Sequence, residues 1–335
     1  MNRTGTYDYK DPKGYEIDYG LLQDFERHLN TSSPESNPIP CSVLGYGEIS
    51  TVFEINAEGM RGLAFKRMSV FEAAGELSQY IQTYQMYNRV LEEEIGIHMP
   101  PHGHAALENK AHRPIFYIIQ EKISPDSIGN NAIHLLPREE IKNLFHWVLR
   151  ELGKIWAHNQ SQPDCLVGID GQISNWVIDD FDASQPNLGE DTVLAYIDTS
   201  TPFLRLQGAE QMDPELFLRS APRTLAWILR SFFLQDVLDR YYDFRRVVID
   251  LVANFYKEQR PDLVPDLLEA ANEFFEEEMG ELAIKPIEEK EVRDYYREDA
   301  LIWRLYLNMR RLDCFLYTKV LRQEYPYILP GKIKR

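Results

Sequence analysis

Two aspartates and an asparagine in the middle of the chain have a spacing suited to metal-dependent phosphate chemistry. Asn175 stands five residues after Asp170, and Asp198 ends a second apolar run further along the chain. In phosphoryl transfer one aspartate can accept the proton of the attacking hydroxyl, while an asparagine and a second aspartate hold metal against the phosphates. The arrangement is therefore suited to phosphoryl transfer from Mg-ATP.

A glycine-rich turn upstream has the properties of a phosphate-covering loop. Gly45 and Gly47 precede an alternating run over residues 51–55, which predicts a strand, a tight turn and a returning strand. Glycine lets backbone N–H groups approach phosphates because it has no Cβ. Ser50 stands where the third glycine of G-x-G-x-x-G would be. The chain has no Walker A sequence, and no βαβ unit follows, so a dinucleotide-binding fold is disfavoured. Taken alone, the glycine pattern also fits an ordinary hairpin.

Lys66 lies inside a short apolar stretch, residues 62–68, that predicts a strand. Two interpretations stay open for a lysine in this position. It neutralises the α- and β-phosphates of a nucleotide and is oriented by a helix carboxylate, or it is an edge-strand lysine that prevents aggregation.

Taken in order, these motifs resemble the protein-kinase-like superfamily over residues 40–205. They are closer to its atypical small-molecule branch, which includes aminoglycoside phosphotransferases and choline kinases, than to eukaryotic protein kinases. The resemblance implies an α+β bilobal fold with a small antiparallel-sheet N-lobe, one long helix, and a larger, mostly helical C-lobe. The implied divisions are an N-terminal extension and connector (1–40), a nucleotide-binding N-lobe (41–123), and a C-lobe with the catalytic loop, metal site and helical substrate region (124–335).

The resemblance also implies how the N-lobe would bind ATP. The phosphates would be covered by the glycine-rich turn, which comprises Gly45, Gly47 and Ser50. Lys66 would pair with the α- and β-phosphates. Residues 114–123 resemble the last N-lobe strand, so backbone groups from Glu121 to Ile123 would contact adenine.

For the C-lobe, the resemblance implies that Asp170 is the catalytic base and that Asn175 and Asp198 bind Mg²⁺ or Mn²⁺. No His-Arg or His-Gly pair precedes Asp170, and Asp198 is followed by Thr-Ser rather than Phe-Gly. The carboxylate partner of Lys66 is predicted to be Glu76. The family spacing would place that partner at residues 82–87, where no acid occurs.

Composition limits the classes of partner. The chain has 335 residues, is 44% hydrophobic and 12% aromatic, and carries a net charge of −17. It is therefore a folded globular protein, and its acidity disfavours nucleic acid and an anionic membrane as partners. A small-molecule acceptor is expected, and a cationic one such as an aminoglycoside or choline would fit the acidity. The sequence gives no oligomeric state.

Localisation is predicted to be cytoplasmic. The three cysteines are widely spaced and form no metal motif, so they are expected to be reduced. The N-terminus is polar and has no signal sequence. The apolar stretch 224–238 is interrupted by Arg230 and Asp236, which argues against a membrane span.

The remaining elements are expected as follows. Residues 99–114 read as a solvated loop, with His102 and His104 as a metal pair in a less favoured interpretation. Residues 124–136 read as a polar linker. Helices are expected at 20–29, 70–95, 137–158, 224–238, 241–256, 263–280 and 292–321.

The leading prediction is an ATP-dependent phosphotransferase, a kinase that transfers the γ-phosphoryl group to a hydroxyl of a small molecule. One alternative is a pseudokinase-like module that binds a nucleotide or a partner with little or no transfer. Another is a helical interaction protein in which the ordered motifs are coincidental.

Overall fold

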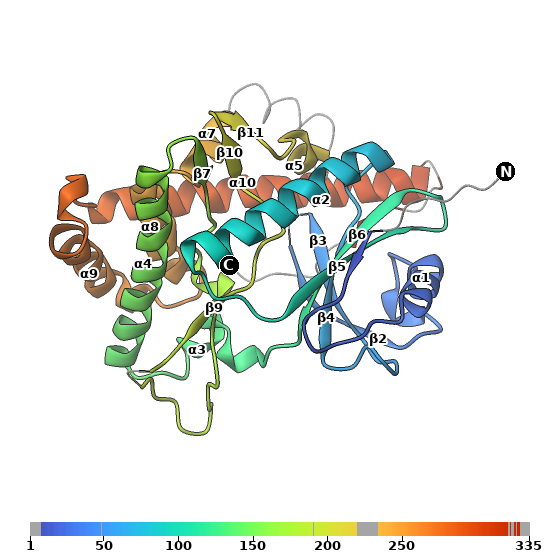
Figure 1. Cartoon of the computed structure of the whole chain (residues 1–335), viewed down its shortest axis with the longest axis horizontal. Helices are drawn as coiled ribbons and strands as arrows, with labels where there is room; N and C mark the ends of the chain where they lie inside the picture. Colours follow the sequence, from blue (N-terminus) through green and yellow to red (C-terminus); the bar gives the residue numbers. More distant parts are fainter. Residues whose placement is uncertain are drawn as a thin grey trace.

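The first part of the chain folds into one antiparallel sheet. The computed structural model describes residues 8–47, 49–189, 191–219, 234–320, 322, 325, 327 and 328. Six strands pair in the order β1-β5-β6-β4-β3-β2, and every pair is antiparallel. Their bounds are β1 Tyr9–Lys10, β2 Cys41–Tyr46, β3 Ser50–Ile55, β4 Leu63–Met68, β5 His102–Glu108 and β6 Pro114–Glu121. The strand that carries Lys66, β4, thus lies inside the sheet between β3 and β6 (Figure 1).

Two helices pack on opposite faces of this sheet. α1 (Tyr19–His28) packs Phe25 into a core that contains Phe65 of β4, and α2 (Ala74–Arg89) packs into another that contains Met68. The alternation of side chains along a strand separates these two cores. It places Phe65 and Arg67 on the α1 face.

A buried ion pair joins α1 to the sheet. Arg67 donates from Nε and Nη2 to the two carboxylate oxygens of Glu26, both at 2.7 Å, and Tyr117 Oη donates to Glu26 Oε2 at 2.6 Å. The Arg67 and Glu26 side chains are 5% and 1% exposed. The helix that precedes the predicted N-lobe is therefore held by a polar network inside the apolar contact.

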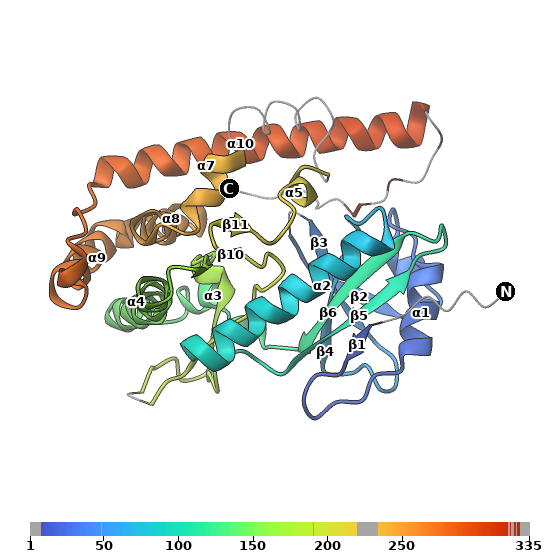
Figure 2. The same cartoon turned by 45° about the horizontal axis from the view of Figure 1, so that its top comes forward.

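The second part is mostly helical. Its main helices are α3 Gly129–Ala132, α4 Arg138–Ser161, α5 Glu215–Arg219, α7 Leu234–Arg240, α8 Phe244–Lys257, α9 Val264–Glu277 and α10 Glu289–Phe315. Apolar residues recur at helical spacing along α4 from Ile141 to Trp156, and all of them except the partly buried Trp147 are buried. Figure 2 shows α10 running along the length of both parts. The predicted α+β architecture, an antiparallel-sheet N-lobe with one long helix followed by a helical C-lobe, is confirmed.

Short strands build the centre of the C-lobe. β7 (Cys165–Val167) pairs with β10 (Leu204–Leu206), which also pairs with β11 (Ala209–Glu210). β8 (Trp176–Ile178) pairs with β9 (Leu194–Tyr196). These two small sheets flank the loop that contains Asp170.

Two predictions about local structure are wrong. Residues 99–114 are not a solvated loop, because they contain β5 (His102–Glu108), which pairs with β1 and β6 and buries His102 and His104. The expected polar linker 124–136 contains α3 and buries Ile133 completely. In both segments the polar residues are interspersed with apolar residues that enter the core, and burial of the apolar residues carries polar neighbours with them into the protein. The expected helix 224–238 lies largely outside the described residues.

Candidate active site

Lys66 reaches from the N-lobe sheet to the C-lobe. Its Nζ lies 2.8 Å from Asp198 Oδ1, and the two side chains are 16% and 30% exposed. Within the sheet Lys66 stands opposite Val52 of β3 and Ile118 of β6. The interpretation as an edge-strand lysine is therefore wrong, and the residue has a specific charged partner across the two lobes.

The glycine-rich turn forms the expected hairpin between β2 and β3. The pairing shifts between Val43 and Gly45, and the N–H of Gly47 donates to the carbonyl of Ser50 at 2.9 Å. A Cβ on Gly47 would lie 2.6 Å from Ser50 Oγ, so a side chain there would displace the serine hydroxyl. Because β3 is the neighbour of β4, the hairpin lies next to the strand that carries Lys66.

The predicted hinge follows β6. The N–H of Glu121 donates to Pro101 at 3.0 Å, and that of Lys122 donates to Gly62 at 2.8 Å. Within the described residues, no hydrogen bond of the Ile123 N–H is recorded. The hinge contact with adenine stays a prediction for both Glu121 and Ile123.

The loop containing Asp170 is held by surrounding backbone and tyrosines. The N–H of Gly168 donates to Phe203 at 2.9 Å, and Tyr87 Oη donates to the carbonyl of Gly168 at 2.9 Å. Asp170 accepts the N–H of Gln172 on Oδ1 at 3.2 Å. These contacts fix the main chain immediately before and after Asp170.

Burial and neighbouring charges raise the pKa of the Asp170 carboxyl. Burial raises its pKa from 3.8 to about 8, and the nearby carboxylates Asp250 and Asp198 act in the same direction. The pKa of Asp198 is shifted in the opposite direction. Burial alone would raise the pKa of Asp198, but the Lys66 ammonium and hydrogen bonds from Ser200 hold it below its ordinary value. The site therefore contains a protonated and an ionised carboxyl near neutral pH, which is typical of functional sites.

Asn175 and Asp198 are brought together by the β8–β9 pair. Trp176 stands opposite Tyr196, and the N–H of Ile197 donates to the carbonyl of Asn175 at 3.0 Å. Asn175 Nδ2 donates to the carbonyl of Asp170 at 3.1 Å. All recorded hydrogen bonds of the Asp198 carboxylate within the described residues involve Oδ1. Its Oδ2 and the amide oxygen of Asn175 are thus available as hard oxygen donors, which Mg²⁺ prefers.

Gly171 is needed because α8 approaches the loop closely. A Cβ at this position would lie 2.7 Å from Val247 Cγ1. We expect Gly171→Ala to lower the free energy of unfolding by about 1–3 kcal/mol through overpacking, measured by urea denaturation. Adding Val247→Ala should recover part of this loss. Gly75→Ala in α2 is the control, because a Cβ at Gly75 would meet no heavy atom within 4 Å apart from its chain neighbours and its own helix backbone. This substitution should be neutral or should stabilise the protein by up to about 1 kcal/mol.

Glu76 is not the partner of Lys66. Its two carboxylate oxygens accept hydrogen bonds from Arg219 at 2.7 and 2.8 Å, and it caps the start of α2. The turns of α2 where the acid would be expected instead contact the C-lobe. Thr83 donates to the carbonyl of Gln211 at 3.2 Å, so α2 is positioned by hydrogen bonds rather than by a lysine–glutamate pair.

The sequence analysis missed the polar residues of α8 beside the loop. Asp250, Asn254 and Lys257 are spaced at i, i+4 and i+7, so they lie on one face of the helix. All three contact the side chain of Gln172. A polar stripe within an otherwise apolar helix is the signal that could have identified them.

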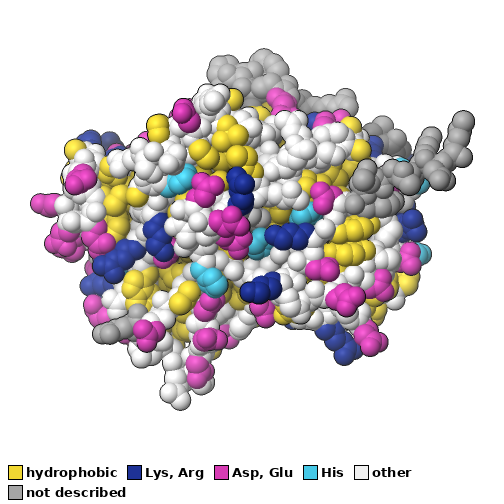
Figure 3. Space-filling model, in the orientation of Figure 1, with side chains coloured by type: hydrophobic (Ala, Val, Ile, Leu, Met, Phe, Trp, Pro, Cys, Tyr) yellow, Lys and Arg dark blue, Asp and Glu magenta, His cyan; other side chains and the backbone are white. Residues whose placement is uncertain are grey.

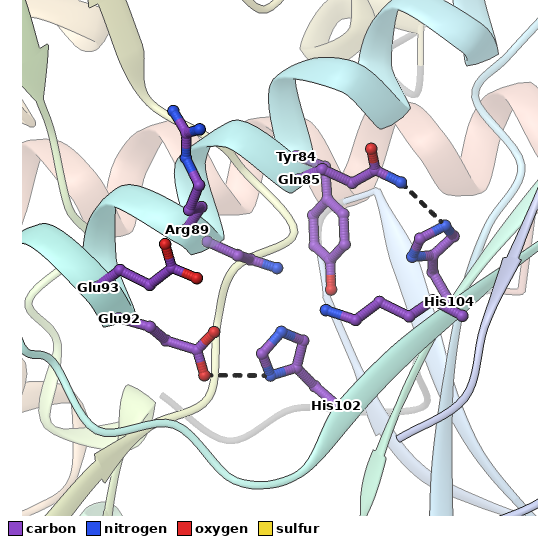
Figure 4. Close-up of a pocket in the computed structure, with 9 residues that line it drawn as sticks. Tyr84, Gln85, Arg89, Glu92, Glu93, His102 and His104 are labelled. Atoms are coloured by element: carbon purple, nitrogen blue, oxygen red, sulfur yellow. Dashed lines mark hydrogen bonds and ion pairs between the residues drawn. The ribbon is translucent and has the colours of Figure 1, made fainter. Parts of the chain in front are cut away.

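His102 and His104 line a separate small cavity of about 80 Å³ between β5 and α2. Figure 4 shows the His102 ring directed toward Glu92 and the His104 ring toward Gln85. His104 Nε2 lies 3.2 Å from Asp8 Oδ1, and His102 Nδ1 lies 3.2 Å from the carbonyl of Pro100. In the part of the chain that is described, no three His, Cys, Asp or Glu side chains are grouped to hold a metal. The metal-pair interpretation therefore receives no support.

The surface agrees with the acidic composition. On the face drawn in Figure 3, described Lys and Arg side chains are interspersed with Asp and Glu and do not gather into one basic area. Of the helices within the described residues, none has both the length and the apolar character needed to cross a bilayer.

Comparisons with known proteins give one family and a number of structural likenesses, two of which are described here. A family model described as "Family of unknown function (DUF6206)" matches residues 26–314. Comparison with curated protein sequences finds no match. "WaaP in complex with acyl carrier protein" is 15% identical with a TM-score of 0.34, covering 78% of this chain and 99% of that one. The GDP complex of wild-type aminoglycoside 2'-phosphotransferase-IIIa is 10% identical with a TM-score of 0.31, covering 72% and 93%. Both TM-scores are below 0.5, so neither likeness carries an argument about function.

Proposed function

Since the chain belongs to DUF6206, a family of unknown function, we propose from its own site that it is an ATP-dependent phosphotransferase acting on a small-molecule hydroxyl. One observation carries this proposal. Lys66 of the sheet and Asp198 of the C-lobe form an ion pair at 2.8 Å, beside the loop that contains Asp170 and Asn175. Four residues predicted from separate motifs thus lie near one another between the lobes, which supports the proposal.

The N-lobe would bind the nucleotide through main-chain and ammonium groups. The hairpin of Gly45, Gly47 and Ser50 would cover the phosphates, with Lys66 against the α- and β-phosphates. The backbone between Glu121 and Ile123 would hydrogen-bond adenine. These contacts stabilise negative charge and orient the γ-phosphoryl group, which is most of what phosphoryl transfer requires from a protein.

Asn175 and Asp198 would hold Mg²⁺ or Mn²⁺ through their available oxygens. When bound, the metal neutralises phosphate charge. Asp170 would then orient the acceptor hydroxyl and take its proton. An aspartate whose pKa is raised to about 8 is protonated at neutral pH, so it becomes a base only when positive charge enters the site and favours its ionised form.

A cationic acceptor would supply part of that positive charge. Burial and the Asp250 carboxyl both disfavour ionisation of Asp170, Asp299 acts in the same way on Asp250, and Lys257 partly offsets the repulsion at both. A positively charged group on the acceptor would relieve this repulsion. This is a local reason for a cationic substrate, whereas the net charge of −17 describes the whole chain.

The second candidate function is a pseudokinase-like module. It is favoured by the pairing within the described residues, where Glu76 binds Arg219 and Lys66 is paired with Asp198 rather than with a helix carboxylate. In such a module, nucleotide or partner binding would persist and transfer would be slow or absent. The dependence of nucleotide binding on metal separates the two candidates.

A thermal-shift titration tests the proposal. With ATP and Mg²⁺ at about 100 times the dissociation constant, the wild type should be stabilised by about 2.7 kcal/mol. Asp198→Asn should abolish the metal-dependent part of the shift. Asp179→Asn, in the same hairpin but paired with His98 at 2.9 Å, should leave the shift intact. A shift that needs no metal would favour the pseudokinase candidate, and the absence of any shift would contradict nucleotide binding.

A further inference from the structure

The polar stripe on α8 converges on one side chain of the catalytic loop. Gln172 Nε2 donates to Asp250 Oδ2 at 3.2 Å. Gln172 Oε1 accepts from Asn254 Nδ2 at 3.2 Å and from Lys257 Nζ at 3.0 Å. Both ends of the amide are engaged by residues of one helix, so the side chain has a single defined orientation.

The main chain of Gln172 in turn contacts the proposed base. Its N–H donates to Asp170 Oδ1 at 3.2 Å, and its carbonyl accepts the N–H of Asn175 at 2.9 Å. A displacement of Gln172 would therefore disturb two groups at once. It would move the N–H that donates to the Asp170 carboxylate, and it would shift the main chain of Asn175, a proposed metal ligand.

An apolar stripe would be the simpler way to pack this helix. Leu251, Val252 and Phe255 of α8 are completely buried, while Asn254 is only 3% exposed among them. Burying polar groups costs free energy unless they form hydrogen bonds. Here Asp250, Asn254 and Lys257 each form a hydrogen bond with Gln172, and Asp250 also bonds to Tyr295. This convergence on one side chain suggests that the stripe fixes the loop.

We propose that Gln172 and Lys257, supported by Asp250 and Asn254, are positioning residues that fix the carboxylate of Asp170. The inference rests on the proposed function, because only there does Asp170 act as a base whose orientation matters. In this chain α8 provides the loop support that the sequence before Asp170 lacks. These residues act on the orientation of the Asp170 carboxylate, and within the described residues none of their recorded hydrogen bonds reaches the proposed nucleotide-binding groups of the N-lobe.

The first test is kinetic and uses Lys257→Met. With the acceptor unidentified, hydrolysis of Mg-ATP in water is the measured reaction. We expect kcat to fall about 10- to 100-fold, as for a small misplacement of a catalytic group, while the KM for ATP changes less than about two-fold. Lys257→Arg should restore most of kcat because it can still donate to Gln172. Lys154→Met, on α4 with its own partner Glu151 at 2.6 Å, is the matched control and should be unchanged.

A double-mutant cycle adds a second readout. Gln172→Leu should lower kcat at least as much, because it removes the bonds to Asp250 and Asn254 as well as the bond to Lys257. Gln172→Leu combined with Lys257→Met should be little worse than Gln172→Leu alone, because both single variants remove the same Lys257–Gln172 hydrogen bond. Full additivity, or a wild-type kcat in Lys257→Met, would overturn the inference. A loss confined to KM would do the same.

Hydrogen exchange separates failure of this inference from failure of the proposed function. Peptides covering residues 168–175 should exchange faster in Lys257→Met than in the wild type, while peptides from α4 should not change. If the wild type hydrolyses no ATP and matches Asp170→Asn, the proposed function fails. In that case faster loop exchange still supports positioning by α8, and unchanged exchange overturns it.

Discussion

Asp170→Asn is expected to lower ATP turnover by about 10²–10⁴-fold, the contribution usual for a general acid–base group. Nucleotide stabilisation in a thermal-shift assay should be retained, because the proposed phosphate contacts come from the N-lobe and the metal contacts from Asn175 and Asp198. Steady-state hydrolysis and the ATP-dependent shift, measured on the same preparations, check both parts. Turnover equal to that of the wild type would remove Asp170 from the role of base.

The same substitution should also change how stability depends on pH. The folded state holds the Asp170 proton up to about pH 8, whereas the unfolded chain loses it near 3.8. Between these values the folded state binds more protons, so stability falls as pH rises and the decline ends above about pH 8. Asp170→Asn removes this dependence. We expect its Tm to exceed that of the wild type by several degrees at pH 8.5, with a much smaller difference at pH 5.

An exposed aspartate provides the control for this pH effect. The pKa of Asp266 is lowered chiefly by its hydrogen bond from Arg138. Its contribution to stability is therefore lost as pH falls, in the opposite direction to Asp170. If Asp266→Asn and Asp170→Asn gave the same profile between pH 5 and 8.5, the effect could not be assigned to the buried site.

Arg67→Met should be the most destabilising of these substitutions. It would leave the buried Glu26 carboxylate with the hydroxyl of Tyr117 as its remaining partner among those described above. Removing one member of a buried ion pair costs about 3–5 kcal/mol, because the other charge remains desolvated. Urea denaturation followed by circular dichroism measures the loss. The double variant Glu26→Leu with Arg67→Met should be more stable than Arg67→Met alone.

Arg27→Met is the matched control, since Arg27 adjoins Glu26 on α1 but lies at the surface. Its ion pair with Asp24 has a separation of 3.6 Å and exposed side chains. Such pairs contribute about 0–1 kcal/mol. Equal losses in Arg27→Met and Arg67→Met would contradict a buried network. A large loss confined to Arg67→Met would show that α1 is an integral part of the N-lobe.

The parts of the fold governed by local patterns could be predicted from sequence. The hairpin around Gly45 and Gly47 follows from glycine spacing and alternation, and the long helix α4 follows from its buried apolar residues. The strand containing Lys66 was also identified. Its interior place in the sheet depends on pairing with β6, which is distant in sequence, and no local pattern reveals that.

Predictions failed where tertiary contacts overrode polarity. His102 and His104 read as loop residues, but apolar neighbours and pairing on both sides bury them in β5. The position of Glu76 on its helix suggests Lys66 as its partner, but the structure pairs Glu76 with Arg219 of α5, which is distant in sequence. The grouping of Gln172 with α8 likewise depends on a fold that brings distant segments together. The predicted domain boundaries and individual site roles remain predictions.

The ion pair between Lys66 and Asp198 has a consequence for the order in which ligands enter. In the resting protein the ammonium proposed for the phosphates neutralises the carboxylate proposed for the metal. A cation arriving alone would compete with Lys66, and a nucleotide arriving alone would draw Lys66 away and leave Asp198 without its counter-charge. When the two arrive as one complex, each charge exchanges one partner for another. The proposed site thus favours simultaneous entry of metal and nucleotide over either ligand alone.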